Sequence, residues 1–388
     1  MAYLISLGFI LGELFKIPFF NFGGATILDL ILIVLVFWAF LQKKLTFKKL
    51  PLFLKAGFGF ASIGLISLVF SPLQLKPLEL LISISYILRF AIFLLASYFV
   101  FLNFFQLKKN TPKTLLFSGV IISLLGILQI IFIPNLGFLA NQGWDPHIYR
   151  TVSTFLDPNF VGAFFVLTLI ILLLKLVKLP QKWFLTFFIL VFIALITTFS
   201  RGAYLAFSLS FLTMALIKKS IKLFILTLIL LLILAGSFFI YQHMVTLPQK
   251  VDRGQSAQQR LGSWQQGFLI FEKNPILGVG FNSYRFALRE YQLASTDQIN
   301  SHGGASNDSA FLFVVSTTGV IGMSVYLLFL FLIFKTAWKN WRAKNIWGLV
   351  VISALIGLIG QSFFANTLFY PALLGWLMLS TSQLSDNN

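Results

Sequence analysis

Cysteine is absent from this chain, and charged residues make up only 10% of it. Without cysteine the protein has no disulfide, no thiol nucleophile and no iron–sulfur or zinc–thiolate site. Acids are scarce, with 11 Asp and Glu among 388 residues, and there are three histidines. Hydrophobic residues account for 58% of the chain and include 47 phenylalanines, and the mean hydropathy is +0.92. Because soluble domains carry about 25% charged residues, this composition excludes a soluble protein.

Apolar runs of about 18 residues or more recur along the chain, long enough to cross about 30 Å of hydrocarbon as helices. Backbone groups in lipid must pair internally, and no alternating strand pattern appears, so we expect helices rather than a barrel. The first run lacks a basic leader and a cleavage site and is interpreted as a retained span. The predicted fold class is all-α and polytopic, with about twelve transmembrane helices near residues 2–20, 25–42, 50–70, 78–106, 113–134, 158–177, 183–199, 202–217, 221–240, 308–334, 345–363 and 366–383.

One long polar segment, residues 241–307, separates the ninth predicted helix from the tenth. It holds four of the eight arginines and two of the three histidines. We therefore divide the chain into helices one to nine (1–240), one large extracytoplasmic loop (241–307), and helices ten to twelve with a short cytoplasmic tail (308–388). A protein that places nearly everything else in lipid is expected to do its chemistry on this loop.

Lysines fix the predicted orientation. Five connections on one side of the predicted bundle are basic and contain no acid, which by the positive-inside rule places them and the N-terminus in the cytoplasm. The net charge of +18 is then mostly a topology signal that also attracts anionic lipid headgroups, and no nucleic-acid partner is needed to explain it. The basic residues of these connections are Lys43, Lys44, Lys48, Lys49, Lys108, Lys109, Lys113, Lys175, Lys178, Lys182, Lys218, Lys219, Lys222, Lys335, Lys339, Arg342 and Lys344.

Arginines follow the opposite distribution, because Arg342 is the only one on the predicted inner side. The guanidinium fork grips phosphate through two hydrogen bonds, whereas lysine acts as a point charge. The bias therefore indicates an anionic substrate at the outer face. The alternative is that these arginines only extend to the membrane interface.

The connection between the seventh and eighth helices reads Ser200-Arg201-Gly202-Ala203. Gly202 and Ala203 allow close helix approach and would hold Arg201 at a defined depth near the interface. A charge there requires a partner or water. Structural anchor and ligand-binding arginine both remain open on this pattern.

Before the sixth helix, Asp157 is a good N-cap and Pro158 a good first helical residue. Capping alone would explain both residues. Asn159, just inside the predicted membrane, is expected to line a polar groove.

The polar loop contains a segment with helical periodicity, residues 260–273. An apolar stripe with charged ends predicts a helix that lies in the membrane interface. Asn274-Pro275 should end it, and Gly278-Val279-Gly280 should form a tight turn; this lone Gly-x-Gly is too weak to indicate a nucleotide-binding loop. The stripe consists of Leu261, Trp264, Phe268 and Phe271.

At the end of the loop, His302 and Asp308 place an imidazole and a carboxylate near each other at the water–lipid boundary. An imidazole with a pKa near 6.5 can accept a hydroxyl proton near neutral pH. The alternative is that Asn307 or Asp308 caps the tenth helix and His302 is a solvated loop residue.

In this order, the motifs resemble those of the O-antigen ligase and O-antigen polymerase superfamily of bacterial envelope glycosyltransferases. The resemblance covers roughly residues 110–325. It rests on Asp157-Pro158-Asn159, Ser200-Arg201-Gly202-Ala203, Arg260, Trp264, Asn274-Pro275, Gly278-Val279-Gly280 and Thr318-Gly319-Val320-Ile321-Gly322.

The resemblance implies transfer of a glycan from an undecaprenyl-pyrophosphate donor to an acceptor hydroxyl, with inversion, at the outer face of the cytoplasmic membrane. The acceptor would be another glycan, a lipid A core or a protein, and the chemistry would need neither metal nor cofactor. The outer acids show no Asp-x-Asp spacing that would indicate a magnesium site.

Carried over by position, the resemblance assigns Arg201 and Arg260 to the donor pyrophosphate. We expect Arg285 and Arg150 to bind the pyrophosphate as well, and the substrate groove to be lined by Asn159, Ser200 and Trp264. His302 would be the general base, with Asp308 as its orienter or as the alternative base. One departure from the family is that its histidine usually precedes the first glycine of the Gly-x-x-Gly turn by eleven residues. Here Asp308 has that spacing from Gly319, and His302 lies seventeen residues before it.

Other functions remain as alternatives. A polysaccharide polymerase of the same superfamily would share this machinery. A flippase or other transporter of lipid-linked glycans should show repeated halves and polar residues at mid-membrane, for which only Arg89 and Gln129 are candidates. A structural scaffold would leave the arginine bias unexplained.

Overall fold

The computed structural model describes residues 1–19, 23–42, 50–142, 144–145, 147–178, 181–246 and 253–385. The predicted inner connection with Lys43, Lys44, Lys48 and Lys49 lies outside the described residues, as do residues 247–252 of the polar loop.

Twelve apolar helices follow the twelve predicted ranges in order. Within the described residues, six are long and apolar enough to cross a membrane, and six are shorter. The long ones are α3 (Leu52–Val69), α4 (Pro77–Phe101), α5 (Leu107–Phe132), α6 (Pro158–Lys178), α9 (Ile221–Tyr241) and α13 (Ala310–Arg342). The shorter ones are α1 (Ala2–Leu11), α2 (Ile27–Leu41), α7 (Lys182–Thr198), α8 (Arg201–Ile217), α14 (Ile346–Gln361) and α15 (Pro371–Thr381). The chain is therefore an all-α membrane protein, and the number of helices that cross the bilayer stays a prediction.

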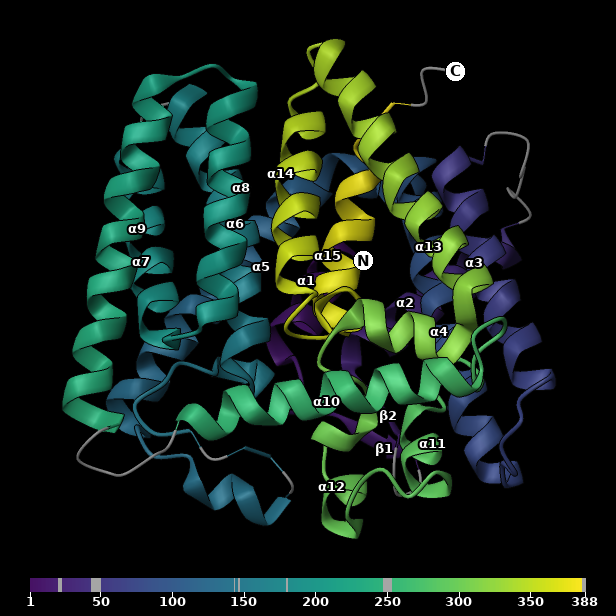
Figure 1. Ribbon diagram of the computed structural model, residues 1–388. Coiled ribbons are helices and arrows are strands. Elements are labelled where there is room, and N and C mark those ends of the chain that lie inside the picture. Colours follow the sequence, from purple (N-terminus) through teal and green to yellow (C-terminus); the bar gives the residue numbers. More distant parts are fainter. Residues whose placement is uncertain are drawn as a thin grey trace.

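The polar loop forms its own small helical layer. Helix α10 (Arg253–Lys273) runs across one end of the bundle, with α11 (Tyr284–Glu290) and α12 (Thr296–Asn300) beyond it (Figure 1). The helix predicted for residues 260–273 is confirmed and begins earlier, at Arg253. The remaining short turns are η2 (Phe104–Gln106), η3 (Gly137–Gln142), η4 (Ser153–Phe155), η5 (Gln242–Thr246), η6 (Gly303–Ala305) and η7 (Thr367–Phe369).

The prediction of one continuous first span over 2–20 is wrong. Helix α1 ends at Leu11, and a short antiparallel hairpin follows, with β1 (Ile17–Phe19) paired to β2 (Gly23–Ala25). Gly12 has a φ of 54°, and its neighbour Glu13 donates its amide to the Thr154 carbonyl at 2.9 Å. A long-range backbone contact thus redirects the chain where the apolar composition alone would continue the helix.

A second correction concerns residues 107–113, predicted as an inner loop. Helix α5 begins at Leu107, so Lys108, Lys109 and Lys113 lie on its first turns. The interruption between α4 and α5 comes earlier in the sequence, because Phe105 and Gln106 have positive φ values of 53° and 54°.

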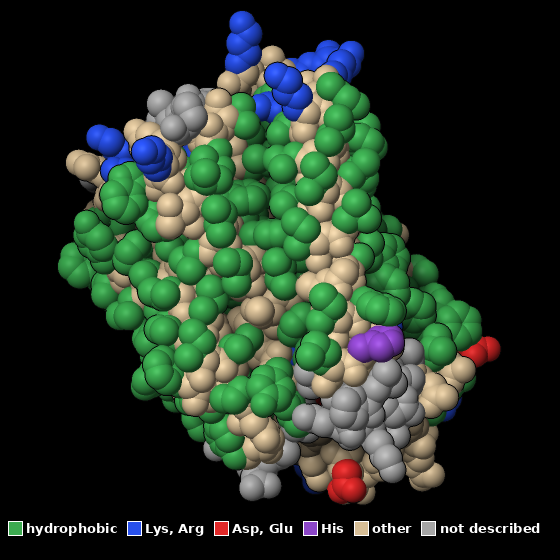
Figure 2. Space-filling view, turned by 90° about the vertical axis from the view of Figure 1, so that its left-hand side faces the viewer, with side chains coloured by type: hydrophobic (Ala, Val, Ile, Leu, Met, Phe, Trp, Pro, Cys, Tyr) green, Lys and Arg blue, Asp and Glu red, His purple; other side chains and the backbone are tan. Residues whose placement is uncertain are grey.

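Charge and burial are distributed as expected for a membrane bundle. On the face shown in Figure 2, Lys and Arg gather at one end, acids and a histidine lie at the other, and a broad apolar band separates them. Helix α6 lies at the centre, because 78% of the residues in its most apolar stretch are buried. Helix α9 lies at the edge, where the corresponding share is 17%. The exposed apolar faces of such outer helices suit contact with lipid.

Candidate functional site

Two glycine motifs that are distant in sequence meet in the structure. Helix α13 is broken at Gly319, which has a φ of 64° and a ψ of −169°. At this break the segment 275–280 docks through backbone hydrogen bonds. Val279 and Gly280 donate to the carbonyls of Ser316 and Thr317 at 3.1 and 2.9 Å, and Val320 donates back to Pro275 at 2.8 Å. The predicted tight turn is confirmed, since Gly278 and Gly280 have φ values of 68° and 105°.

The start of α13 is built around a buried amide. Ser309 is the N-cap and accepts from the Leu312 amide, so the alternative in which Asn307 or Asp308 caps this helix is wrong. Asn307 is fully buried; its Nδ2 donates to the Tyr284 hydroxyl at 3.0 Å and to the Ser263 carbonyl. Burial raises the pKa of Tyr284 to about 12, so this hydroxyl stays protonated.

Asp308 is held with its carboxylate unengaged. Its amide donates to Ser263 Oγ at 3.1 Å, while no side chain or amide of the described residues donates to the carboxylate. Burial raises the pKa of Asp308 to about 6, which the charge of Arg260 opposes and those of Asp145 and Asp157 reinforce. Charged residues from four segments of the chain therefore interact electrostatically here, namely Asp145, Asp157, Arg260 and Asp308.

Arg260 is presented by α10, whose packing face is not the predicted apolar stripe. The buried side of the helix consists of Ser263, Gly267 and Ile270. Gly267 permits this close approach, because a Cβ there would lie 2.6 Å from Asn307 Nδ2. Leu261 and Phe268 of the predicted stripe are each 57% exposed. Trp264 and Phe271 of the stripe are half-buried, so only its Leu261 and Phe268 positions are left uncovered by protein, and these two support the prediction that α10 lies in the membrane interface.

The turn between α7 and α8 presents Arg201. Phe199 has a φ of 46°, which ends α7 and allows Ser200 to cap α8 by accepting from the Ala203 amide at 3.2 Å. Ser200 Oγ donates to Asn159 Oδ1 at 2.6 Å. Arg201 is the first residue of α8 and is exposed.

Arg150 stabilises the turn between α7 and α8 through hydrogen bonds to its backbone. Its Nε donates to the Thr198 carbonyl at 2.9 Å and its Nη2 to the Phe199 carbonyl at 3.5 Å. Gln129 holds the segment that carries Arg150, since its Oε1 accepts from the Val152 amide at 3.0 Å. Arg150 thus positions the backbone next to Arg201, and Gln129 positions the backbone next to Arg150.

The predicted cap of α6 is confirmed. Asp157 Oδ1 accepts from the amides of Asn159 and Phe160 at 2.6 and 3.2 Å. Burial raises the pKa of Asp157, and these hydrogen bonds and the charge of Arg150 oppose the rise.

Arg285 and His302 belong to the part of the polar loop that follows α10. Arg285 is only 6% exposed, and its Nη2 donates to the Ser301 carbonyl at 2.9 Å. Burial lowers the pKa of Arg285. His302, the next residue after Ser301, is exposed and packs on Trp144 with ring centroids 4.4 Å apart. The structure therefore places Arg285 where it orients the His302 turn.

The connection after α14 joins the Arg201 side to the Asp308 side. Gln361 Nε2 donates to the Asn159 carbonyl at 2.9 Å, and the Ser362 carbonyl accepts from the Ala310 amide at 2.8 Å. The rings of Trp264 and Phe364 lie 5.7 Å apart. Sequence reasoning missed this connection, although a Gln-Ser pair at the end of an apolar run was a usable signal.

A family model described as O-antigen ligase matches residues 185–327. This segment belongs to the O-antigen ligase superfamily. No curated protein matches the chain. The matched O-antigen ligase segment runs from α7 into α13 and includes Arg201, Arg260, His302 and Asp308. Arg150, Asn159 and Gln361 lie outside the O-antigen ligase match and are brought to it by folding.

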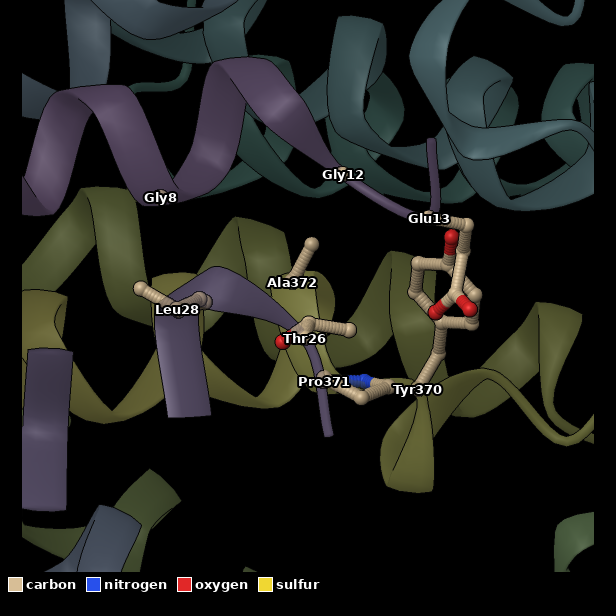
Figure 3. Close-up of a pocket in the computed structure, with 8 residues that line it drawn as sticks. All are labelled: Gly8, Gly12, Glu13, Thr26, Leu28, Tyr370, Pro371 and Ala372. Carbon is tan, nitrogen blue, oxygen red and sulfur yellow. The ribbon is translucent and has the colours of Figure 1, made fainter. Parts of the chain in front are cut away.

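Of two cavities in the described part of the chain, one borders the O-antigen ligase segment and the other lies between α1, α2 and α15. An apolar groove of about 370 Å³ opens between α5, α7 and α9 and is lined by Ile130, Tyr149, Ile196, Thr197, Phe199, Ser237, Ile240, Tyr241 and Met244. Its walls include the neighbours of Arg150 and Ser200. A second pocket, near Glu13 and Tyr370, has a volume of about 10 Å³, too small for a sugar or a phosphate (Figure 3).

The mid-membrane polar residues have structural partners. Arg89 Nη2 lies 3.0 Å from Asp29 Oδ2 and also donates to the Gly24 carbonyl. Asp29 in turn completes a capping box with Thr26 at the start of α2. These contacts, together with those of Gln129, account for the two residues that had suggested a transporter.

Proposed function

We propose that this protein transfers a glycan from an undecaprenyl-pyrophosphate donor to an acceptor hydroxyl at the outer end of the bundle. The family match supports glycosyl transfer of the O-antigen ligase or polymerase type. The observation that carries the proposal is the unengaged carboxylate of Asp308, with a pKa of about 6, next to the charge of Arg260.

The reaction needs one proton acceptor. The acceptor oxygen forms a bond to the anomeric carbon as the bond from that carbon to the pyrophosphate oxygen breaks. The hydroxyl proton passes to the base, and the electron pair leaves with the lipid pyrophosphate. A carboxylate with a pKa near 6 is ionised at neutral pH and basic enough to take this proton in the transition state. Asp308 is therefore our first candidate base, and His302 is the second.

The leaving group needs positive charge. Arg201 stands exposed at the N-terminus of α8, where the helix dipole also favours an anion. Arg260 supplies a second guanidinium near Asp308. Arg150 and Arg285 donate to backbone carbonyls, so we assign them to positioning the Arg201 turn and the His302 turn. Preorganised charge of this kind is often the largest contribution to catalysis.

The lipid tail of the donor also needs a place. The apolar groove of about 370 Å³ contains Phe199, two residues from Arg201, and Tyr149, one residue from Arg150. An isoprenoid chain in this groove would bring its pyrophosphate to the Arg201 turn. The basic opposite end of the bundle supports an extracytoplasmic position for this site, in the cytoplasmic membrane of the cell.

The proposal is tested with purified protein in lipid vesicles, a labelled undecaprenyl-pyrophosphate oligosaccharide, and three acceptors offered separately: lipid A core, lipid-linked glycan and protein. We expect Arg201→Ala, Arg260→Ala and Asp308→Asn to lower transfer by at least 100-fold. Arg342→Ala, which removes the arginine at the opposite end of the bundle, should leave transfer unchanged. Wild-type transfer rates in all three site variants, or lipid transport with no covalent product, would overturn the proposal. The preferred acceptor separates ligase from polymerase.

A further inference from the structure

A bidentate ion pair joins the polar loop to the membrane bundle. Arg289, near the end of α11, donates from Nη1 and Nη2 to Oε1 and Oε2 of Glu79 at 2.5 and 3.1 Å. Glu79 lies in the first turn of α4, and its side chain is only 8% exposed. A buried carboxylate is costly unless it is paired, so a contact of this kind between residues 210 positions apart needs an explanation.

The carboxylate of Glu79 is also fixed by its own helix. Its Oε2 accepts from the amide of Lys76, the N-cap residue of α4, at 3.1 Å. Because a guanidinium and a carboxylate meet as two flat forks, the ion pair sets the direction of the Arg289 side chain as well as its distance. Glu79 therefore gives α11 a fixed point of attachment on the bundle.

Further contacts extend this attachment along α11. The hydroxyl of Ser283, the N-cap residue of α11, is hydrogen-bonded to the hydroxyl of Ser83 on α4 at 3.2 Å. At the other end of the helix, Glu290 Oε2 accepts from the Gln74 amide at 3.0 Å. Helix α11 is thus attached at both ends to α4 and to the segment that precedes α4.

Helix α11 in turn holds the segments that carry the two candidate bases. Its Arg285 donates at 2.9 Å to the carbonyl of the residue before His302. Its Tyr284 hydroxyl accepts at 3.0 Å from the side-chain amide of the residue before Asp308. The helix also packs on η6 and α13. One short helix therefore connects the ion pair of Glu79 to both sides of the proposed reaction site.

We propose that Glu79 is a positioning residue for glycan transfer: through Arg289 it fixes α11, and α11 fixes the segments that carry His302 and Asp308. This inference rests on the proposed function and adds a residue of α4, outside the family match of residues 185–327. Glu79 need not touch the substrate, because a shift of about 1 Å in a reacting group can cost about 100-fold in rate.

The test compares Glu79→Gln and Arg289→Gln with Glu13→Gln as the matched control. Glu79→Gln keeps the size of the side chain and an oxygen for the Lys76 amide. Glu13 is another buried carboxylate with a basic partner 3.0 Å away, but that partner, Lys16, belongs to the same short segment before β1. Glu13→Gln therefore removes an ion pair without releasing the polar loop.

Turnover and lipid binding are measured on each variant in nanodiscs. We expect Glu79→Gln and Arg289→Gln each to lose about 10-fold or more in kcat, while their affinity for sugar-free undecaprenyl pyrophosphate stays unchanged. Glu13→Gln should keep the wild-type kcat. A fall in kcat for Glu13→Gln as large as for Glu79→Gln would indicate a general loss of structure and overturn the proposal.

The two changes should not add. If Glu79 acts through Arg289, the double variant should lose about 10-fold in kcat, as each single variant does, and not about 100-fold. A lipid-binding role for Arg289 gives another pattern, since freeing its guanidinium in Glu79→Gln would tighten binding of the sugar-free lipid and Arg289→Gln would weaken it. Either that pattern or additive losses would overturn the proposal.

Hydrogen exchange provides a readout that does not depend on turnover. We expect the amides of residues 296–309 to exchange at least about 5-fold faster in Glu79→Gln and Arg289→Gln than in the wild type, because a loosened α11 protects both segments less. Glu13→Gln should exchange at the wild-type rate there. Unchanged exchange in the Glu79 variant would overturn the route through α11. Faster exchange with a wild-type kcat would show a structural contact only, and would also overturn the proposal.

Failure of this inference is distinguishable from failure of the proposed function. If the wild type transfers glycan and the Glu79 and Arg289 variants transfer it equally fast, the positioning role is overturned and the proposed function stands. If the wild type binds neither lipid nor makes any product, the proposed function has failed and the role of Glu79 in transfer with it.

Discussion

Gly278 lies directly against the backbone of Thr317, so that a Cβ on the glycine would overlap the Thr317 carbonyl group. The arrangement is reciprocal, because a Cβ on Gly319 would overlap the carbonyl of Ile276. Both glycines have positive φ, 68° and 64°. The loop and the broken helix thus fit together only through the absence of two side chains.

Gly319→Ala should be strongly destabilising. The substitution adds a clash to a backbone conformation that alanine adopts only with strain, and we expect a loss of at least about 3 kcal/mol in the free energy of unfolding. Thermal unfolding in detergent measures this loss. Gly262→Ala is the control: a Cβ there meets no described atom within 4 Å, and the change should stabilise α10 by up to about 1 kcal/mol. Equal unfolding temperatures for the two variants would contradict the docked arrangement.

Asp308→Asn should stabilise the protein at neutral pH. The folded-state pKa of about 6 is above the ordinary value of 3.8, so ionising Asp308 costs the folded state stability as pH rises through this window. The cost is fully present above pH 6 and amounts to about 2 to 3 kcal/mol. Unfolding measured at pH 4 and pH 7 should therefore show a gain for Asp308→Asn at pH 7 that shrinks at pH 4. A gain independent of pH would argue against a raised pKa.

Arg260→Gln should move the acidic limb of the pH–rate profile upward. The charge of Arg260 opposes the rise in the pKa of Asp308, so its removal raises that pKa further. If Asp308 is the base, kcat/KM in the variant should begin to fall at a higher pH than in the wild type. The control is His302→Asn, which should leave the acidic limb in place. If the limb instead disappears in His302→Asn and stays fixed in Arg260→Gln, His302 is the base.

Arg285→Gln separates positioning from pyrophosphate binding. Because Arg285 is buried and donates to the Ser301 carbonyl, the variant should lose about 10-fold or more in kcat while its affinity for sugar-free undecaprenyl pyrophosphate stays unchanged. Binding and turnover are measured on the same preparation. An affinity loss as large as that of Arg201→Ala would show instead that Arg285 binds the pyrophosphate.

Local patterns predicted much of this structure. Twelve helical ranges, the Asp157 cap and the Gly278–Gly280 turn follow from periodicity and backbone preference, which act over a few residues. The predictions failed where contacts between distant segments of the chain determine where a helix begins or ends. Helix α1 stops because Glu13 bonds to Thr154, a partner more than 100 residues away in sequence. The run from Asn307 to Ser309 contains three possible caps in a row, and only packing against Ser263 and Tyr284 selects Ser309.

The candidate site was predicted as a list of residues and not as an arrangement. Sequence gave no means of distinguishing Arg201, which is exposed at a helix start, from Arg285, which is buried against a carbonyl. It also gave no reason to include Gln361 and Ser362, since their proximity to Asn159 and Ala310 depends on how α14 packs.

The seam between Pro275–Gly280 and the break in α13 restricts how the enzyme can open. Residues on both sides of the seam exchange backbone hydrogen bonds, so this stretch cannot swing out as a lid without breaking the bundle itself. To admit a bulky glycan, the parts of the loop on either side of this stretch would have to move. These parts are α10 before Asn274 and the turns after Glu290. Exchanging the loop between relatives would accordingly fail unless the matching turn of α13 were exchanged with it.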